Sequence, residues 1–413
     1  MATEGSRREE VLETAATMFA SSGLRTSLKE IADAAGILPG SLYHHFDSKE
    51  AIIVELVRRY QDDLDRVAKE ALDALHELDP RAAEERIVEL GEAIAACAVR
   101  HRAALLLTLY DPPTNAGDEL AELARQTPTA IYAAMFEILQ AGQKSREIRS
   151  GIDLQLLSER ICQSMLHVGV GTFHRSQAGH HLPAQKCRVF LHGVAVRPPS
   201  KTALDRSEGM QAARQVIATW GGVQPDDDRV AHVQAVARAE FGRRGYEATT
   251  IRDIAAAAGL STGTVYRMFN SKDDLLLSIM EAYSEHFATA WDAVVASRSS
   301  PLEQLDALMW VNINVLDRFS EEFNIQLAWL RQTPPTTLDL GLSLGHQLQQ
   351  LKAMLAAGEK AGEVRVEGAS ADARARSLYE LLLTPETIVR TAGTRQAHAL
   401  ARDTVLRGAA PRT

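Results

Sequence analysis

Two segments of the sequence repeat one ordered set of small, hydroxyl-bearing, aromatic and cationic residues. Gly36–Ile52 reads GILPGSLYHHFDSKEAI, and Gly259–Leu275 reads GLSTGTVYRMFNSKDDL. Glycine lets a backbone approach a partner closely. The hydroxyls of serine, threonine and tyrosine can bond to phosphates or to base edges. The chemistry that this set supports in both places is contact with DNA.

A lysine follows the aromatic residues in each segment, at Lys49 and at Lys272. Each lysine is expected to open a long helix rich in Leu, Ile and Val, at the end where the helix dipole disfavours a cation. A lysine placed there twice indicates an anion close by, and a DNA phosphate meets that requirement. Tyr43 and Tyr266 can present a phenol to phosphate as well, although a place in the core is the alternative for both.

A supporting first helix and two short helices must position these residues. The unit around Gly36–Ile52 is called copy one, and the unit around Gly259–Leu275 is called copy two. In copy one, a first helix with apolar residues at helical spacing ends near Gly23, and Ser27 is expected to cap a second helix. Gly36 ends that second helix, and a third begins near Pro39. This order is a helix-turn-helix, with Phe46 and Ile31 expected in its core. The matching residues of copy two are Gly245, Thr250, Gly259, Thr262, Phe269 and Ile254.

The repeat is much longer than the two segments. Ile31–Gly36 (IADAAG) matches Ile254–Gly259 (IAAAAG), and far downstream Leu139–Arg149 (LQAGQKSREIR) matches Leu355–Arg365 (LAAGEKAGEVR). About 195 residues are thus duplicated in the same order, which indicates two tandem copies of one protein.

The fold class expected is all-α, because Ala and Leu dominate and no convincing period-2 strand pattern occurs. Each copy is predicted to hold a helix-turn-helix domain followed by a helical ligand-binding and dimerisation bundle. Pro, Gly, Ser and acids between the copies predict a linker, with a short helix possible inside it. The expected domains are 1–60 and 61–196 for copy one, 197–227 for the linker, and 228–282 and 283–413 for copy two.

The composition limits the other possibilities. The net charge is −9, so any DNA binding must come from local positive groups. The three cysteines, Cys97, Cys162 and Cys187, lack CxxC spacing and are expected as reduced thiols. No apolar run approaches the roughly 18 residues of a membrane span, so a cytoplasmic protein without a membrane partner is expected.

The repeated frame, preceded by IA..AG, resembles the DNA-binding end of the TetR family of bacterial transcriptional regulators. The resemblance covers roughly residues 6–59 and 228–282 and is weaker elsewhere. It implies a ligand-responsive regulator, a repressor in the first place, that binds double-stranded operator DNA and a small-molecule effector. It also implies DNA contacts by Ser27, Pro39, Gly40, Ser41, Tyr43, His44, His45 and Lys49, and in copy two by Thr250, Thr262, Gly263, Thr264, Tyr266, Arg267 and Lys272.

Two positions depart from the pattern. Leu38 stands where a Ser or Thr usually precedes the recognition helix, so a weaker N-cap is expected in copy one. Met268 stands where copy one has His45 and cannot make that polar contact, although the neighbouring Arg267 can compensate. The alternative function follows from Met268: one copy reads DNA, while copy two serves as a dimerisation or ligand-sensing module.

An effector pocket is expected among the middle helices, where isolated polar groups lie among apolar ones. The segment SLYHHFDSKEAI is similar to regulators of steroid and fatty-acid breakdown, some of which sense acyl-CoA thioesters. This similarity implies a small hydrophobic or acyl-CoA-like effector. The candidate contacts are Tyr110, Phe136, His167, Trp310, Asn314, Phe323 and Trp329, for which ordinary bundle core is an equally good interpretation.

Other classes of function find little support. His167, His174, His180, His181 and His192 crowd one region with Cys162 and Cys187, but no tight metal-ligand spacing occurs. No nucleophile–base motif or phosphate-binding glycine loop is present either. We therefore expect no enzyme, no cofactor and no metal.

Assembly within one chain is favoured over a homodimer with four DNA-reading domains. Helices near 154–171 and 183–196 are expected to pair with helices near 371–391 and 395–407, which would make the chain a pseudo-dimer. The third helix of each helix-turn-helix, called the reading helix, is encoded separately in the two copies. The two reading helices are therefore free to differ and to read two unlike half-sites.

Overall fold

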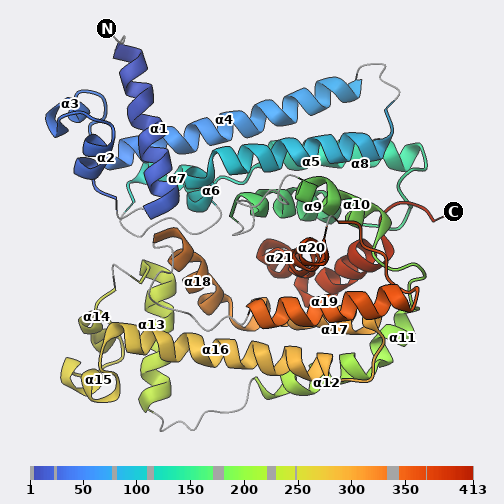
Figure 1. The fold of residues 1–413 in the computed structure, drawn as a ribbon. Helices are drawn as coiled ribbons and strands as arrows, with labels where there is room; N and C mark the ends of the chain where they lie inside the picture. The colour runs from blue at the N-terminus through green and yellow to red at the C-terminus, as the bar shows by residue number, and fades with distance from the viewer. Residues whose placement is uncertain are drawn as a thin grey trace.

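The computed structural model describes residues 4–22, 26–76, 81–108, 116–170, 181–220, 229–246, 249–332, 344–368 and 370–412. Within these ranges the chain is helical apart from turns, loops and one isolated antiparallel bridge between Ala195 and Val364. The all-α prediction is confirmed for the described residues. Figure 1 shows the copies one above the other. The helices in the middle are α9 (Leu154–Val170) and α10 (Leu182–His192) of copy one, and α20 (Ala371–Leu382) and α21 (Glu386–Ala401) of copy two.

Copy one has a small head and a bundle of longer helices. The head consists of α1 (Glu4–Ser22), α2 (Leu28–Ala34) and α3 (Pro39–Tyr43). The 28-residue α4 (Lys49–His76) leads from the head into the bundle. The bundle continues with α5 (Ala83–Arg100), α6 (Arg102–Thr108), α7 (Asp118–Arg125), α8 (Thr129–Lys144), α9 (Leu154–Val170) and α10 (Leu182–His192).

Copy two follows the same order. Its head is formed by α13 (Arg229–Arg244), α14 (Ile251–Ala257) and α15 (Thr262–Met268). Its α21 is kinked at Gly393, where φ is 77°. The bundle consists of α16 (Lys272–Val295), α17 (Pro301–Arg318), α18 (Ser320–Gln332), α19 (Leu344–Lys360), α20 (Ala371–Leu382), α21 (Glu386–Ala401) and the π-helix η3 (Arg402–Arg407).

Residues 201–219 of the expected linker fold onto copy two. They form α11 (Lys201–Arg206) and α12 (Glu208–Thr219), which pack against α17, and α12 also packs along α16. Met210 and Ala213 are fully buried there, and Ile217 nearly so. In copy one it is α8 that packs along α4. The expectation of a short helix in the linker is confirmed, but this helix belongs to the core of copy two because its apolar face needs cover.

The copies exchange backbone hydrogen bonds at their matching C-terminal ends. After Gly193 in copy one and Gly408 in copy two, two successive N–H groups donate to carbonyls of the other copy. These bonds, of 2.7 to 3.1 Å, join Val194 to Val405, Ala195 to Leu406, Ala409 to Phe190 and Ala410 to Leu191. The exchange is reciprocal, as expected of two related halves around a two-fold axis. In the described residues, α9 contacts α21, and α10 contacts α20 and η3, which are segments expected to pair. That the chain works as a complete pseudo-dimer stays a prediction.

Buried charged groups at this interface differ between the two copies. Lys186 is 1% exposed, pairs with Glu380 of copy two and donates to the Ser164 carbonyl at 3.4 Å. When the starts of α9 and α20 are aligned, the position of Glu380 in copy two corresponds to Gln163 in copy one. Copy one therefore has no carboxylate at this position. Pairing copy one with another copy one would therefore leave the Lys186 ammonium buried without its carboxylate. This interface favours unlike copies.

Arg160 of copy one also bonds to copy two. Its guanidinium donates to Thr384 Oγ1 and to the Leu381 carbonyl, both at 3.0 Å, and lies 5.5 Å from the Phe190 ring centre. Complete burial lowers the pKa of Arg160 to about 9. Buried charges of this kind are tolerated only where their partners are in place, so both copies are needed to satisfy them.

Lys186→Met should destabilise the folded chain by about 3–5 kcal/mol, because it leaves the Glu380 carboxylate buried without its cation. The double variant Lys186→Met/Glu380→Gln should recover most of that loss, and Lys69→Met, which changes an exposed lysine, should lose little. Urea denaturation of the full chain measures all three. Equal losses in the single and the double variant would contradict the assignment of this pair.

Candidate DNA-binding surface

The second helix of each head begins at a capping box. In copy one, Ser27 Oγ accepts the Glu30 N–H at 3.2 Å, and Glu30 Oε2 accepts the Ser27 N–H at 2.7 Å. Thr250 and Asp253 repeat both bonds in copy two, at 3.2 and 2.9 Å. Both caps were predicted from the sequence and are confirmed. They fix the turn from which the reading helix starts, and both hydroxyls lie at the surface.

The reading helices α3 and α15 each bury one face and expose the other. Leu42 and Phe46 are buried in copy one, as are Val265 and Phe269 in copy two. The expected core roles of Phe46 and Phe269 are thereby confirmed, as are those of Ile31 and Ile254, which are both 0% exposed. The opposite face of each helix is left to contact a partner.

Tyr43 and Tyr266 lie on that outer face, with 54% and 53% exposure. A core role for these two tyrosines, the alternative from the sequence, is therefore wrong. Both phenols are free to reach a phosphate outside the protein. The equal exposure in the two copies indicates that each head presents its aromatic residue in the same way.

Most of the other expected contacts share this surface. Exposed residues are Pro39, Gly40, Ser41 and His44 in copy one, and Gly263 and Arg267 in copy two; His45, Thr262 and Thr264 are half-buried. A Cβ on Gly40 would meet no atom within 4 Å, and on Gly263 only Ser261 Oγ at 3.9 Å. Packing inside the protein thus does not require either glycine. A close approach of DNA does account for a small residue at both positions.

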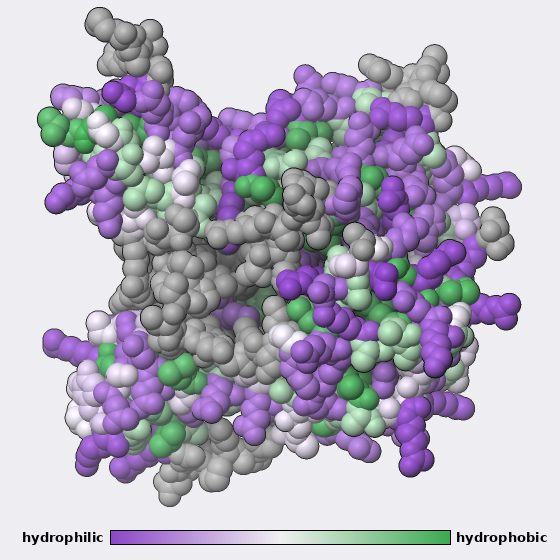
Figure 2. All heavy atoms as spheres, in the orientation of Figure 1, coloured by the Kyte–Doolittle hydropathy of each residue, from purple (hydrophilic) through white to green (hydrophobic). Residues whose placement is uncertain are grey.

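The two reading helices differ at their starts. Ser261 Oγ accepts the Thr264 N–H at 3.2 Å, whereas Leu38 offers no side-chain bond to α3. The predicted weaker cap of copy one is confirmed. Leu38 is 75% exposed, and Figure 2 shows apolar atoms at the outer tip of the copy-one head over α3. An exposed leucine beside the reading helix can contact a thymine methyl group, which Ser261 cannot do as well.

Lys272 has a partner inside the protein, which the sequence did not indicate. Its ammonium donates to the carbonyls of Tyr246 and Thr249, at 2.8 and 3.0 Å, and lies 4.1 Å from the Tyr246 ring centre. The premise that this cation lacks a partner is therefore wrong. In copy one, Lys49 is half-buried, and burial lowers the pKa of its ammonium. Contact of either lysine with phosphate stays a prediction.

Both heads lie on the same side of the molecule. Figure 1 shows α2 and α3 at the upper left and α14 and α15 at the lower left, and Figure 2 shows the heads as separate lobes with mainly hydrophilic surfaces. Two reading helices on one side are the arrangement by which helix-turn-helix dimers enter successive major grooves.

The structure does not gather the expected effector contacts into one cavity. Phe136 lines a cavity of about 630 Å³ in copy one, together with Tyr132, whereas Trp310 lines a separate cavity of about 560 Å³. His167 Nδ1 contacts the Gln163 carbonyl at 2.6 Å, and burial lowers the pKa of this histidine. Asn314 donates to the Trp310 carbonyl at 2.8 Å.

The other three of the seven candidates are not placed in either cavity. Phe323 is half-buried and packs against the core. Tyr110 lies outside the described residues, as does the side chain of Trp329. The assignment of an effector pocket therefore stays a prediction, with Phe136 the member of the set that lines a cavity in copy one.

The histidine-rich region shows no metal centre in the part of the chain that the structure describes. Cys162 and Cys187 are buried thiols, and burial raises the pKa of Cys187 to about 12; His174 and His180 lie outside the described residues. A different group, Asp63, Cys97 and His101, has the proximity that a metal site needs.

This second group is poorly suited to a cation. The Asp63 carboxylate accepts bonds from Arg66 and Arg100, both at 2.7 Å, and from His101 at 2.9 Å. Burial by itself would raise the pKa of Asp63, but these bonds outweigh it and hold the pKa below its usual value. The two guanidinium groups would repel a metal ion.

Exposed reading helices on twin heads define a DNA-binding protein of the helix-turn-helix class. The sequence profile of the bacterial regulatory proteins of the tetR family matches residues 11–56 and again 234–279. The HTH-type transcriptional repressor KstR2 of Rhodococcus jostii (strain RHA1) is 41% identical over 152 residues, which span 36% of this chain and 72% of that relative. The chain belongs to the TetR family and is a DNA-binding transcriptional regulator.

Two more comparisons record further similarities. The probable acrEF/envCD operon repressor of Escherichia coli (strain K12) is 31% identical over 153 residues, which span 36% of this chain and 68% of that relative. The solved structure of the ketosteroid transcriptional regulator KstR2 of Mycobacterium tuberculosis aligns over 42% of this chain and 94% of its own, with 21% identity and a TM-score of 0.36. Among the described helices, none is long and apolar enough to cross a membrane.

Replacing Lys49 or Lys272 by alanine should weaken binding to every duplex similarly, because phosphate contacts carry no sequence information. The slope of log K against log salt should fall by about 1 for each lysine. Lys144→Ala, at the end of α8, is the matched control and should leave the slope unchanged. Fluorescence anisotropy over a salt series measures the slopes.

Lys272→Ala should also lower the melting temperature, because the bonds to Tyr246 and Thr249 are lost. Binding must therefore be measured well below that temperature. Unchanged salt slopes in two folded variants would show that neither lysine contacts phosphate.

Proposed function

We propose that this chain is a single-chain repressor whose two copies act as the two halves of one DNA-binding unit. The relative from Rhodococcus jostii is named a transcriptional repressor, and repression by occupying an operator needs only tight, specific binding. The observation that carries the proposal is the presence of two heads with the same exposed tyrosine on one side of one chain. Such a regulator works beside the chromosome, in the cytoplasm of a bacterium.

Pairing within the chain supplies the two-fold arrangement that other helix-turn-helix proteins obtain by dimerisation. The reciprocal bonds around Gly193 and Gly408 join the copies, and the Lys186–Glu380 pair favours unlike partners. A homodimer of whole chains would need a further interface, and it would carry four heads for each particle. We therefore favour one chain as the complete unit.

The two heads share their scaffold and differ where bases are read. Copy one presents His44 and the apolar Leu38. Copy two presents Arg267, whose guanidinium donates to Thr264 Oγ1 at 3.0 Å and thus lies along α15. An arginine held in this way can reach a phosphate or a guanine edge, whereas a histidine is a weaker guanine reader. We infer that the operator consists of two unlike half-sites.

An effector would release the operator by favouring a form in which the two heads are wrongly spaced. Coupling of about 1–3 kcal/mol, or 5–150-fold in affinity, is typical of such switches. The cavity of about 630 Å³ in copy one, lined in part by Tyr132 and Phe136, is the place we propose for a small hydrophobic or acyl-CoA-like effector. Its size lies in the range of pockets that hold drug-sized ligands.

The second candidate function uses copy two only for dimerisation or ligand sensing. It is motivated by Met268, which is half-buried and replaces a histidine. The exposure of Tyr266 and Arg267 favours reading by both copies instead. Arg267→Ala separates the two functions, because it should relax specificity in one half-site only if copy two reads bases.

Selection of binding sites from random duplexes should recover two unlike half-sites with centres about 34–36 Å apart, or a multiple of that distance. Arg267→Ala should lose about 1–3 kcal/mol of discrimination at one base pair of one half-site, leaving the other half-site unchanged. Arg206→Ala, at an exposed arginine of α11, is the control.

Two results would contradict this account. A perfect palindrome occupied equally by both heads would show that the copies read alike. Full operator affinity and specificity in Arg267→Ala would support the second function, in which copy two reads nothing.

A further inference from the structure

A basic cleft lies where residues 198–219 of the expected linker, called the connector below, meet copy two. The cavity of about 560 Å³ is bounded by α11 and the residues before it, by α12, by α17, and by α21 with η3. Five cationic side chains line it, against two acidic ones. The cations are Lys201, Arg214, Arg395, Arg402 and Arg407, and the acids are Asp205 and Asp403.

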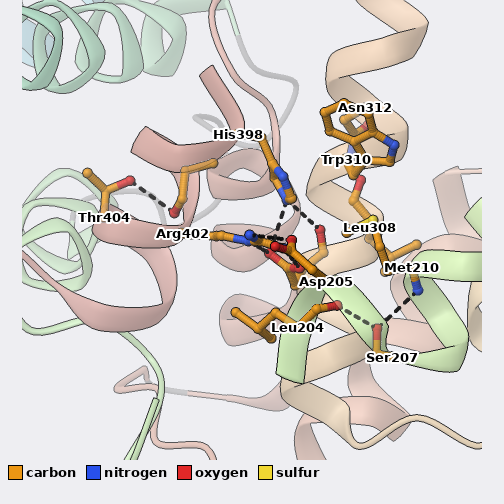
Figure 3. Close-up of polar contacts among 12 residues, drawn as sticks. Leu204, Asp205, Ser207, Met210, Leu308, Trp310, Asn312, His398, Arg402 and Thr404 are labelled. Atoms are coloured by element: carbon orange, nitrogen blue, oxygen red, sulfur yellow. Dashed lines mark hydrogen bonds and ion pairs between the residues drawn. The ribbon is translucent and has the colours of Figure 1, made fainter. Parts of the chain in front are cut away.

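The floor of this cleft is a rigid network of charges. Asp306 is completely buried, and its carboxylate accepts two bonds from Arg402, at 2.7 and 2.6 Å. His398 Nε2 lies 3.0 Å from the same carboxylate and 3.2 Å from the Asp306 backbone carbonyl, to which it hydrogen-bonds. The third nitrogen of the Arg402 guanidinium bonds Asp205 on the connector at 2.8 Å. Figure 3 shows Arg402 directed at Asp205, with His398 beside Trp310. Every charge in the floor therefore already has its partner.

The acids of the cleft are thus neutralised by other groups. Asp205 pairs with Arg402, and Asp403 pairs with Arg149 of copy one at 2.7 Å. Within the described part of the chain, no acidic side chain pairs with Lys201, Arg395 or Arg407. Three exposed cations thus remain around one cavity and give it a positive potential.

An aromatic wall completes the cleft. The Trp310 ring lies 5.1 Å from the His398 ring, centre to centre, and its indole Nε1 is buried without a hydrogen-bond partner among the described residues. A buried indole N–H usually has a hydrogen-bond acceptor, because burying the N–H without a hydrogen bond costs free energy. Pro198 and Pro199 add a stiff, apolar segment of the connector to the lining.

We propose that this cleft binds a small aromatic anion, a carboxylate or a phosphate monoester. Guanidinium groups bind both kinds of oxyanion through paired hydrogen bonds, so Arg395 and Arg407 would hold the charged end. Trp310, which lines the cleft, would contact the ring of the ligand. The site needs the connector as one of its walls, and it lies apart from the cavity beside Phe136. It does not depend on the DNA-binding function.

Isothermal titration of the full chain tests the proposal with four probes. Phenyl phosphate and benzoate carry the ring and a charge, whereas phenol carries the ring alone, and inorganic phosphate reports on the charge alone. We expect at least one of the two aromatic anions to bind clearly more tightly than both phenol and inorganic phosphate. Which of them binds better identifies the oxyanion that the cleft prefers.

The double variant Arg395→Gln/Arg407→Gln should weaken binding of that anion about tenfold or more, as expected when two charged hydrogen-bonding partners are removed. Arg206→Gln, an exposed arginine of the same connector that does not line the cleft, should bind like the unaltered chain. Arg395→Lys/Arg407→Lys should retain part of the affinity, because the charge is kept. Thermal unfolding of each variant checks that it is folded.

Several results would overturn the proposal. One is that neither aromatic anion binds at millimolar concentration, and another is that phenol binds as tightly as both. A third is unchanged affinity in a folded Arg395→Gln/Arg407→Gln variant, which would place the anion elsewhere. Operator binding without any probe is measured in parallel, so loss of the anion site is distinguishable from loss of the DNA-binding function.

Discussion

The reciprocal backbone exchange between the two C-terminal segments is the constraint on which the rest of the structure depends. Gly193 and Gly408 adopt φ values of 68° and 83°, in the left-handed region that favours glycine. A Cβ on either glycine would also collide with the backbone of the other copy. The two chain segments can therefore cross only because a glycine stands at the crossing in each copy. This crossing fixes how one bundle lies on the other, and with it where the heads lie.

The packing of the two copies leaves the DNA-binding surface of each head exposed. Each head has the same buried Ile, Phe and Leu or Val residues and the same exposed tyrosine, so both are presented alike. Leu38, His44 and Arg267 are among the differences that lie on the outer face. A chain that encodes its two halves separately can change one reading helix and keep the other. A homodimer cannot do so, because each mutation appears in both of its halves.

Much of the fold and of the DNA-binding surface could be predicted from the sequence. The repeated frame, the caps at Ser27 and Thr250, and the core roles of Phe46 and Phe269 depend on local patterns. The packing of α12 was less evident, although Met210, Ala213 and Ile217 lie on one helical face and indicate an apolar stripe. The partners of Lys272 and the cleft beside Trp310 depend on residues that are distant in sequence, and no local pattern reveals them.

The central claim is that one chain makes a complete DNA-binding unit. Native mass spectrometry of the chain on its selected operator tests this claim most directly, because it counts the protein chains on one duplex. We predict one chain of 45.1 kDa per duplex, with the same ratio at nanomolar and micromolar protein. A complex that always holds two chains per duplex, with no single-chain complex at any concentration, would contradict the account.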